Sequence, residues 1–184
     1  MRSRRIDRIS VAIVLSVLVS TFVVGGSRAI AANPNCVPVG GSFMTNLAAI
    51  PGSVGGDPGR VPSTTLGRVT GDLSGGVAAT ILKVASSGDN LVFTVQHHIV
   101  TDSGDFIFAN NAHATVIQVP GAVTPLFAIV TYPVHIIGGT GKFAGATGDI
   151  TNIGEVSVPN FASGDLSGGT LILRYSGNIC FATR

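Results

Sequence analysis

The stretch Ile136–Ile150, IIGGTGKFAGATGDI, places five glycines and a lysine directly behind a run of apolar residues. Such a turn can bind phosphate when a glycine precedes the Gly-Lys pair by five positions and a hydroxyl residue follows it. The sequence has Ile136 and Phe143 at those two positions. No helix is predicted after the stretch, as a dinucleotide-binding βαβ unit would require. We therefore interpret the stretch as the end of a buried strand and a tight turn, with Phe143 pointing inward.

The chain around this stretch shows the pattern of short β-strands separated by turns. Runs rich in β-branched and aromatic residues alternate with turn sequences such as SSGDN and TDSGD, and no run has a helical period. Strands are predicted over residues 77–85, 91–100, 106–119, 126–137, 150–158 and 170–181. Roughly six to eight antiparallel strands fit a sandwich or a closed barrel, and we favour the barrel because closure removes exposed edges.

Two further sequence features bear on this fold. The hexapeptide GDLSGG occurs at Gly71–Gly76 and at Gly164–Gly169, each time before an apolar run. Asp, Ser and Gly are typical turn residues, so both copies are interpreted as turns at similar barrel corners. The run 126–137 is apolar on both alternating faces, which is typical of a strand covered on both sides.

The glycine stretch resembles the GGTGxFxGAxG signature of the allene oxide cyclase barrel-like domains and the related plant dirigent proteins. The order of the other features is similar as well: GDLSGG, a strand with two adjacent histidines, TDSGD, the glycine stretch, and a last strand ending in Ile-Cys. The resemblance covers roughly residues 65–180 and points to a secreted member of bacterial type.

This resemblance implies an antiparallel β-barrel of about eight strands, often trimeric, with an apolar central cavity. Plant relatives use that cavity to steer a reactive intermediate to one stereochemical product, so it implies a cyclase or isomerase that acts by confinement. No position in this sequence matches the catalytic residues of those relatives, so no catalytic residue is assigned. Four glycines are assigned to the structural turn: Gly138, Gly139, Gly141 and Gly145.

The N-terminus has the three parts of a signal peptide. The basic sequence MRSRRIDR precedes the apolar run Ile9–Val24, and small residues follow up to Ala31. The apolar run has 16 residues, whereas a membrane-spanning helix needs about 20. We predict cleavage of residues 1–31 and a secreted, periplasmic or extracellular protein with no membrane contact afterwards; the alternative is an uncleaved anchor.

Cleavage would also change the charge of the protein. Residues 1–31 contain five of the 11 Lys and Arg residues and one of the nine Asp and Glu residues. The remaining chain has six basic and eight acidic groups, so its net charge is six minus eight, or −2. A chain with this balance has no basic face for nucleic acid. No cofactor is indicated.

The remaining 153 residues (184 minus 31) suffice for one domain. Residues 32–64 are rich in Gly and Pro and are predicted to be a poorly ordered N-terminal segment, followed by the barrel domain at 65–184. The two cysteines, Cys36 and Cys180, are predicted to form a disulfide in an oxidising compartment. The alternative is two separate buried thiols.

Four histidines lie in predicted strands. Neighbouring His97 and His98 must face opposite sides of the sheet, but alternation does not show which side lines a cavity. We name His98, His113 and His135 as weak candidates for ligand binding, with a purely structural role as the alternative. No pair has the short spacing of metal ligands, so no metal site is predicted.

Two functional hypotheses follow. In the first, the secreted barrel binds a small apolar ligand, either as a binding protein or as a cyclase or isomerase that acts by confinement. In the second, it is a non-enzymatic scaffold or interaction protein, and the run 126–137 helps to form a dimer or trimer. Whether the protein is an enzyme stays open at this point.

Overall fold

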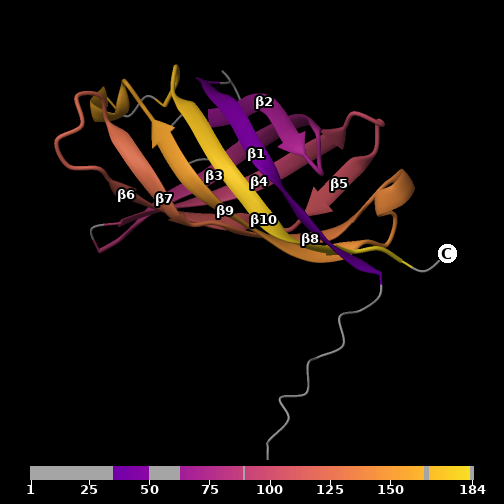
Figure 1. Cartoon of the computed structure of the whole chain (residues 1–184). Coiled ribbons are helices and arrows are strands. Elements are labelled where there is room, and N and C mark those ends of the chain that lie inside the picture. Colours follow the sequence, from indigo (N-terminus) through magenta and orange to yellow (C-terminus); the bar gives the residue numbers. More distant parts are fainter. Residues whose placement is uncertain (1–34, 50–62, 89, 164–165, 183–184) are drawn as a thin grey trace, which may run out of the picture. The chain divides into compact units, whose positions relative to one another are not determined.

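The computed structural model describes residues 35–49, 63–88, 90–163 and 166–182. The predicted signal peptide and residues 32–34 and 50–62 of the predicted Gly/Pro-rich segment lie outside these residues. The described chain contains ten strands and two short 3-10 helices (Figure 1). The strands are β1 Cys36–Ala49, β2 Ser63–Gly71, β3 Gly75–Ser87, β4 Asn90–Thr101, β5 Phe106–Ala109, β6 Ala112–Gln118, β7 Leu126–Thr131, β8 Pro133–Gly139, β9 Thr147–Ser157 and β10 Thr170–Cys180. The helices are η1 Gly141–Phe143 and η2 Phe161–Ser163.

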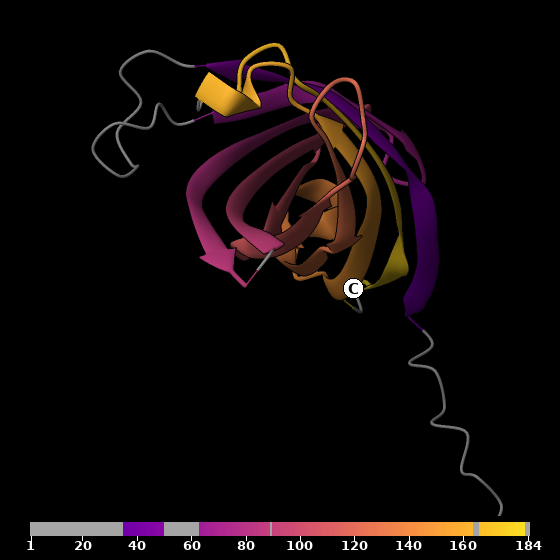
Figure 2. The same cartoon turned by 90° about the vertical axis from the view of Figure 1, so that its left-hand side faces the viewer.

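All strand pairs are antiparallel, and they close into a ring. Neighbouring strands pair in the order β10-β1-β2-β3-β4, and the ring continues through β6, β7 and β9 back to β10. The couple β5 and β6 occupies one position beside β4, and the couple β7 and β8 occupies one position beside β9. The fold is therefore the predicted closed, eight-stranded antiparallel barrel, and Figure 2 shows the strands curving around its interior.

Strand β1 corrects the predicted start of the barrel domain at residue 65. It pairs with β10 on one side and β2 on the other, so the ring cannot close without it. Its alternation of inward Val39, Phe43 and Leu47 is hidden in the sequence by Pro38 and a Gly-Gly pair, which suggested a loop. Residues 36–49 of the predicted N-terminal segment therefore form a barrel strand, and residues 50–62 lie outside the described residues.

The predicted disulfide is confirmed. Cys36 and Cys180 are directly opposite each other in the β1–β10 register, and their sulfur atoms are bonded. The bridge therefore links the first strand of the barrel to the last.

Two predicted strands are broken in the middle. The run 106–119 divides into β5 and β6, and the run 126–137 divides into β7 and β8. In the second run the register shifts by one residue, because Thr115 pairs with Thr131 while Val116 pairs with Ile129. The shift reverses the alternation, so that Tyr132, between β7 and β8, points inward. The outward side chains of this run are predicted to be covered, but Val130 and Ile137 are exposed in the single chain, while Leu126 and Ala128 are partly buried.

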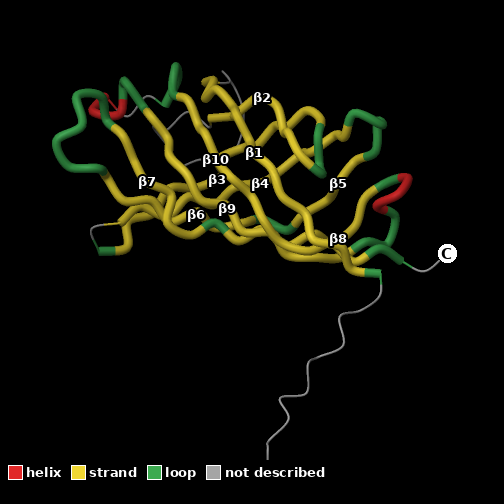
Figure 3. Tube along the Cα trace, in the orientation of Figure 1, coloured by secondary structure: helices red, strands yellow, loops and turns green. Residues whose placement is uncertain are grey.

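The two short helices lie at opposite ends of the barrel, separated by the length of β9 (Figure 3). At one end, η1 belongs to the glycine stretch and buries Phe143, which is 1% exposed and packs against Phe181. Gly141 has a φ of +51°, and a Cβ there would collide with the carboxylate of Asp105. Phe143 is buried, as predicted. Of the four glycines predicted to form the turn, Gly141 and Gly145 lie in it, whereas Gly138 and Gly139 are the last residues of β8.

At the other end, the connection between β9 and β10 covers the interior. The Phe161 ring packs edge-on against Phe127 at 4.6 Å, and the backbone of Leu47 bonds to Gly168 and Gly169. No described helix has the length and apolar character needed to cross a membrane.

Candidate ligand-binding cavity

The barrel interior contains two adjoining chambers. The apolar chamber is enclosed mainly by hydrophobic side chains, among them Ile81, Phe93, Val116, Phe127, Ile129 and Phe161. The polar chamber lies beside it and contains Thr45, His97 and Asn152 among its lining residues. Four residues line both: Thr65, Ala79, Tyr132 and Leu171. The volume open to the centre of a water-sized molecule is about 60 Å³ in the apolar chamber and about 20 Å³ in the polar chamber.

A histidine and a tyrosine meet at the junction of the chambers. The Nε2 atom of His97, on β4, is 2.6 Å from the hydroxyl of Tyr132. Two local features position the pair: Tyr132 points inward because of the break between β7 and β8, and the residue opposite His97 on β3 is the small Ala79. The same breaks that interrupt the strand pattern therefore create the polar part of the cavity, as bulges often do beside functional sites.

Asn152, on β9, supplies hydrogen bonds to the backbone at the break between β7 and β8. Its backbone N–H and its side-chain Nδ2 both donate to the carbonyl oxygen of Tyr132, each at 3.0 Å. Because the nitrogen end of the amide is committed to this carbonyl, Oδ1 is the free end. Asn152 is only 2% exposed, so this oxygen is held inside the barrel.

Three buried side-chain atoms in the described chain lack a hydrogen-bond partner: Thr45 Oγ1, His97 Nδ1 and Asn152 Oδ1. All three residues line the polar chamber. A buried polar atom without a partner costs about 1–3 kcal/mol, so the three atoms make the polar chamber the candidate site in this barrel.

Both members of the His–Tyr pair are uncharged near neutral pH. The pKa of His97 is lowered to about 4. Burial is the larger cause, and the neighbouring His98 is the smaller one. Burial also raises the pKa of the Tyr132 hydroxyl above its ordinary value. No charged side chain is among the residues that line either chamber. The cavity is therefore neutral as well as largely apolar.

The three histidines predicted as weak ligand candidates have exposed side chains. His113 contacts Thr94 on the neighbouring strand, and His135 forms an ion pair with Asp149 at 2.8 Å. Neither these two nor His98 lines a chamber. The histidine that lines the cavity is His97. In the sequence it shares a strand face with Phe93, Val95 and Ile99, and this apolar face is the one that points into the barrel.

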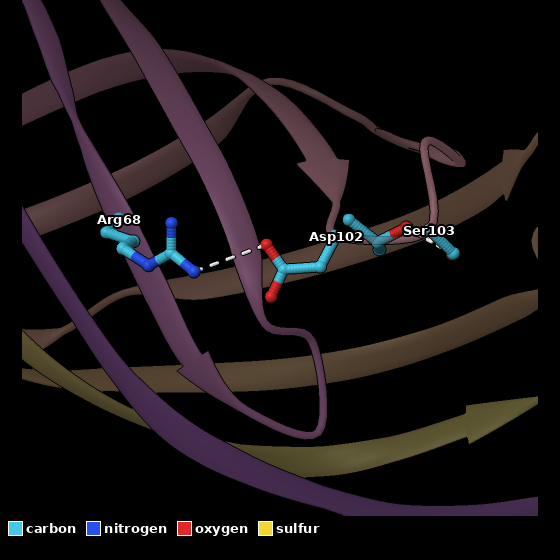
Figure 4. A network of polar contacts seen from close by, with 4 residues as sticks. Arg68, Asp102 and Ser103 are labelled. Carbon is cyan, nitrogen blue, oxygen red and sulfur yellow. Dashed lines mark hydrogen bonds and ion pairs between the residues drawn. The ribbon is translucent and has the colours of Figure 1, made fainter.

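The acidic residues of the TDSGD sequence belong to a turn between β4 and β5. Asp102 forms an ion pair with Arg68 at 3.3 Å (Figure 4). Ser103 bonds to the Thr101 hydroxyl and to Asp105. These contacts agree with the turn that the sequence predicts at TDSGD. Among the described residues, no group of three His, Cys, Asp or Glu side chains is arranged to hold a metal ion.

Comparison with known proteins found no matching family model, curated protein or solved structure. The functional interpretation therefore depends on the cavity and on the outer surface of the barrel.

Proposed function

We propose that the protein is secreted and that its barrel holds a small, uncharged hydrophobic molecule. The observation that carries the proposal is the apolar chamber with a cluster of unpartnered polar atoms at one side. Ligand sites in proteins typically combine an apolar lining with a few polar groups that fix orientation. The disulfide is compatible with an oxidising compartment outside the cytoplasm.

The resemblance of the glycine stretch to the allene oxide cyclase barrel-like family extends this proposal to a reaction. The closed eight-stranded barrel is the fold that such membership implies. An apolar chamber would restrict the conformations of a reactive intermediate and so favour one cyclisation or isomerisation product. Tyr132 lines both chambers and His97 lines the polar chamber, so these two residues are the polar groups that such an intermediate would meet.

Mass spectrometry under native conditions, on protein purified from its own host, tests ligand binding. Ala79 lines both chambers, so Ala79→Leu fills space that the ligand would occupy, whereas the adjacent Ala78 faces the other side of the strand. We expect a small apolar molecule to accompany the wild-type protein and Ala78→Leu but not Ala79→Leu. A ligand-free wild-type protein that also fails to bind toluene and phenol would contradict the proposal.

A second candidate function, as an interaction protein, is favoured by the outer surface. Five exposed apolar side chains lie on consecutive strands and form what we call the outer stripe: Leu66 on β2, Met44 on β1, Ile172 on β10, Ile153 on β9 and Val130 on β7. Met44 is 63% exposed and lies directly opposite Ile172. Contiguous exposed apolar patches mark interaction sites.

The partner that fits the outer stripe is a second copy of the chain. Arg68 lies opposite Met44, and Glu155 lies opposite Ile172. The order across the four strands is thus Arg68, Met44, Ile172, Glu155. A two-fold axis between the two apolar residues would place Arg68 of each copy against Glu155 of the other. The row is therefore complementary to itself in charge as well as in hydrophobicity.

A further inference from the structure

The polar chamber restricts the chemistry of the ligand that the proposed function requires. Asn152 Oδ1 can only accept a hydrogen bond, and the bond that Nδ2 donates to the carbonyl oxygen of Tyr132 fixes the orientation of the amide. A ligand group in this chamber must therefore donate a hydrogen. A ketone, aldehyde or ester oxygen cannot donate, so it would leave Asn152 Oδ1 unpaired inside the barrel.

The other two unpartnered atoms require an acceptor on the same group. If the Tyr132 hydroxyl donates to His97 Nε2, the ring proton is on Nδ1, which then acts as a donor. The Thr45 hydroxyl can also donate. A group that gives one hydrogen bond to Asn152 and accepts two, from His97 and Thr45, satisfies all three residues. A hydroxyl has this combination of one donor and two lone pairs.

The charge of the lining residues and the size of the polar chamber restrict the possible ligands further. No charged side chain lines the chamber, and His97 is neutral, so a carboxylate or ammonium group would be buried without a counter-charge. A water molecule needs roughly 10–15 Å³ of the space open to its centre, and the polar chamber has about 20 Å³. One hydroxyl fits there, while the apolar body of the ligand would lie in the larger chamber beyond Tyr132.

We propose that the ligand is a small, neutral monohydroxy compound, an alcohol or a phenol, whose hydroxyl binds Asn152, His97 and Thr45. This assignment rests on the proposed ligand-binding function and adds the chemical class. It also gives Tyr132 a defined part, since its hydroxyl sets the His97 tautomer that the ligand oxygen meets.

Phenol and toluene provide the test, because they have the same shape and differ in the hydroxyl. Titrations of the ¹⁵N-labelled full chain, followed by NMR, would give both dissociation constants and the His97 ring nitrogen shifts. We expect phenol to bind about tenfold or more tightly than toluene, because toluene has no hydroxyl and leaves the buried polar atoms of the chamber without hydrogen bonds. Benzoate and benzaldehyde should bind more weakly than phenol.

The variant Thr45→Val provides a second test, because it removes one hydrogen-bond donor to the ligand hydroxyl and keeps the shape of the side chain. We expect the preference for phenol over toluene to fall severalfold in this variant, while toluene affinity stays unchanged. The ligand-free variant should also unfold at a higher temperature than the wild type, since an unpartnered buried hydroxyl is gone.

The outcomes separate the two proposals. Equal binding of phenol and toluene would overturn the hydroxyl assignment and leave ligand binding standing, with ordered water as the occupant of the polar chamber. Binding of neither probe would count against the proposed function itself. A phenol preference that Thr45→Val leaves unchanged would also overturn the assignment.

Discussion

His97 shows how burial sets the chemistry of a single residue in this barrel. Its ring is surrounded by interior side chains, and its Nε2 bonds to Tyr132, so the neutral form is favoured over the charged form. The adjacent His98 lies on the outer face and is exposed. One step along a strand therefore separates a neutral cavity residue from an ordinary surface residue.

The pH dependence of stability is expected to report this difference. The pKa of His97 is about 4 in the folded protein, against about 6.5 in an unfolded chain. Between these values the unfolded state binds more protons, so the free energy of unfolding falls as the pH is lowered from 6.5 to 4. The loss from this residue is about 3 kcal/mol.

Chemical denaturation at several pH values checks this prediction. His97→Gln keeps a polar partner for Tyr132 but does not titrate, so its stability should decline less than that of the wild type between pH 6.5 and 4. His98→Gln is the matched control and should follow the wild type. Identical slopes for His97→Gln and the wild type would show that His97 is not held neutral by burial.

At the scale of the elements, β1 and its disulfide close the barrel. The strand pairs with β2 and β10, and the Cys36–Cys180 bridge joins residues 144 apart in the sequence. A cross-link over such a long loop restricts the unfolded chain strongly.

Removal of the bridge is therefore expected to destabilise the barrel by roughly 2–5 kcal/mol. Thermal unfolding of Cys36→Ala/Cys180→Ala, compared with wild type with and without reductant, measures the effect. The chain has only these two cysteines, so reduced wild type should match the double variant. Unchanged melting temperatures would indicate that strand pairing alone holds β1 in place.

For the whole molecule, the closed ring leaves outward side chains as the remaining surface for association. The outer surface of a barrel is convex, so a partner would contact mainly Met44 and Ile172 of the outer stripe and the two charged residues beside them, Arg68 and Glu155. A dimer through this row would cover Met44 and Ile172, which face solvent in the single chain. The proposed dimer would also leave the two interior chambers unaffected.

Light scattering during size-exclusion chromatography tests the dimer. We expect the wild type to elute as a dimer and Met44→Lys as a monomer, because a charge would enter the apolar centre of the interface. Ile117→Lys, on the outer face of β6, is the matched control and should stay dimeric. Arg68→Glu should weaken the dimer and Arg68→Glu/Glu155→Arg should restore it; a monomeric wild type would refute the proposal.

The all-β class and the inward position of Phe143 follow from local patterns, because turn residues and alternation specify such features without knowledge of the neighbours. The barrel is favoured over a sandwich because closure removes exposed edges, and the disulfide is predicted because the chain has only two cysteines and a signal for an oxidising compartment. The place of β1 in the ring did not follow, because pairing with β10 joins residues far apart in sequence. The cavity depended on tertiary structure for the same reason. A register shift brings Tyr132 to His97, and Asn152 joins them from β9 through contacts that no alternation pattern contains.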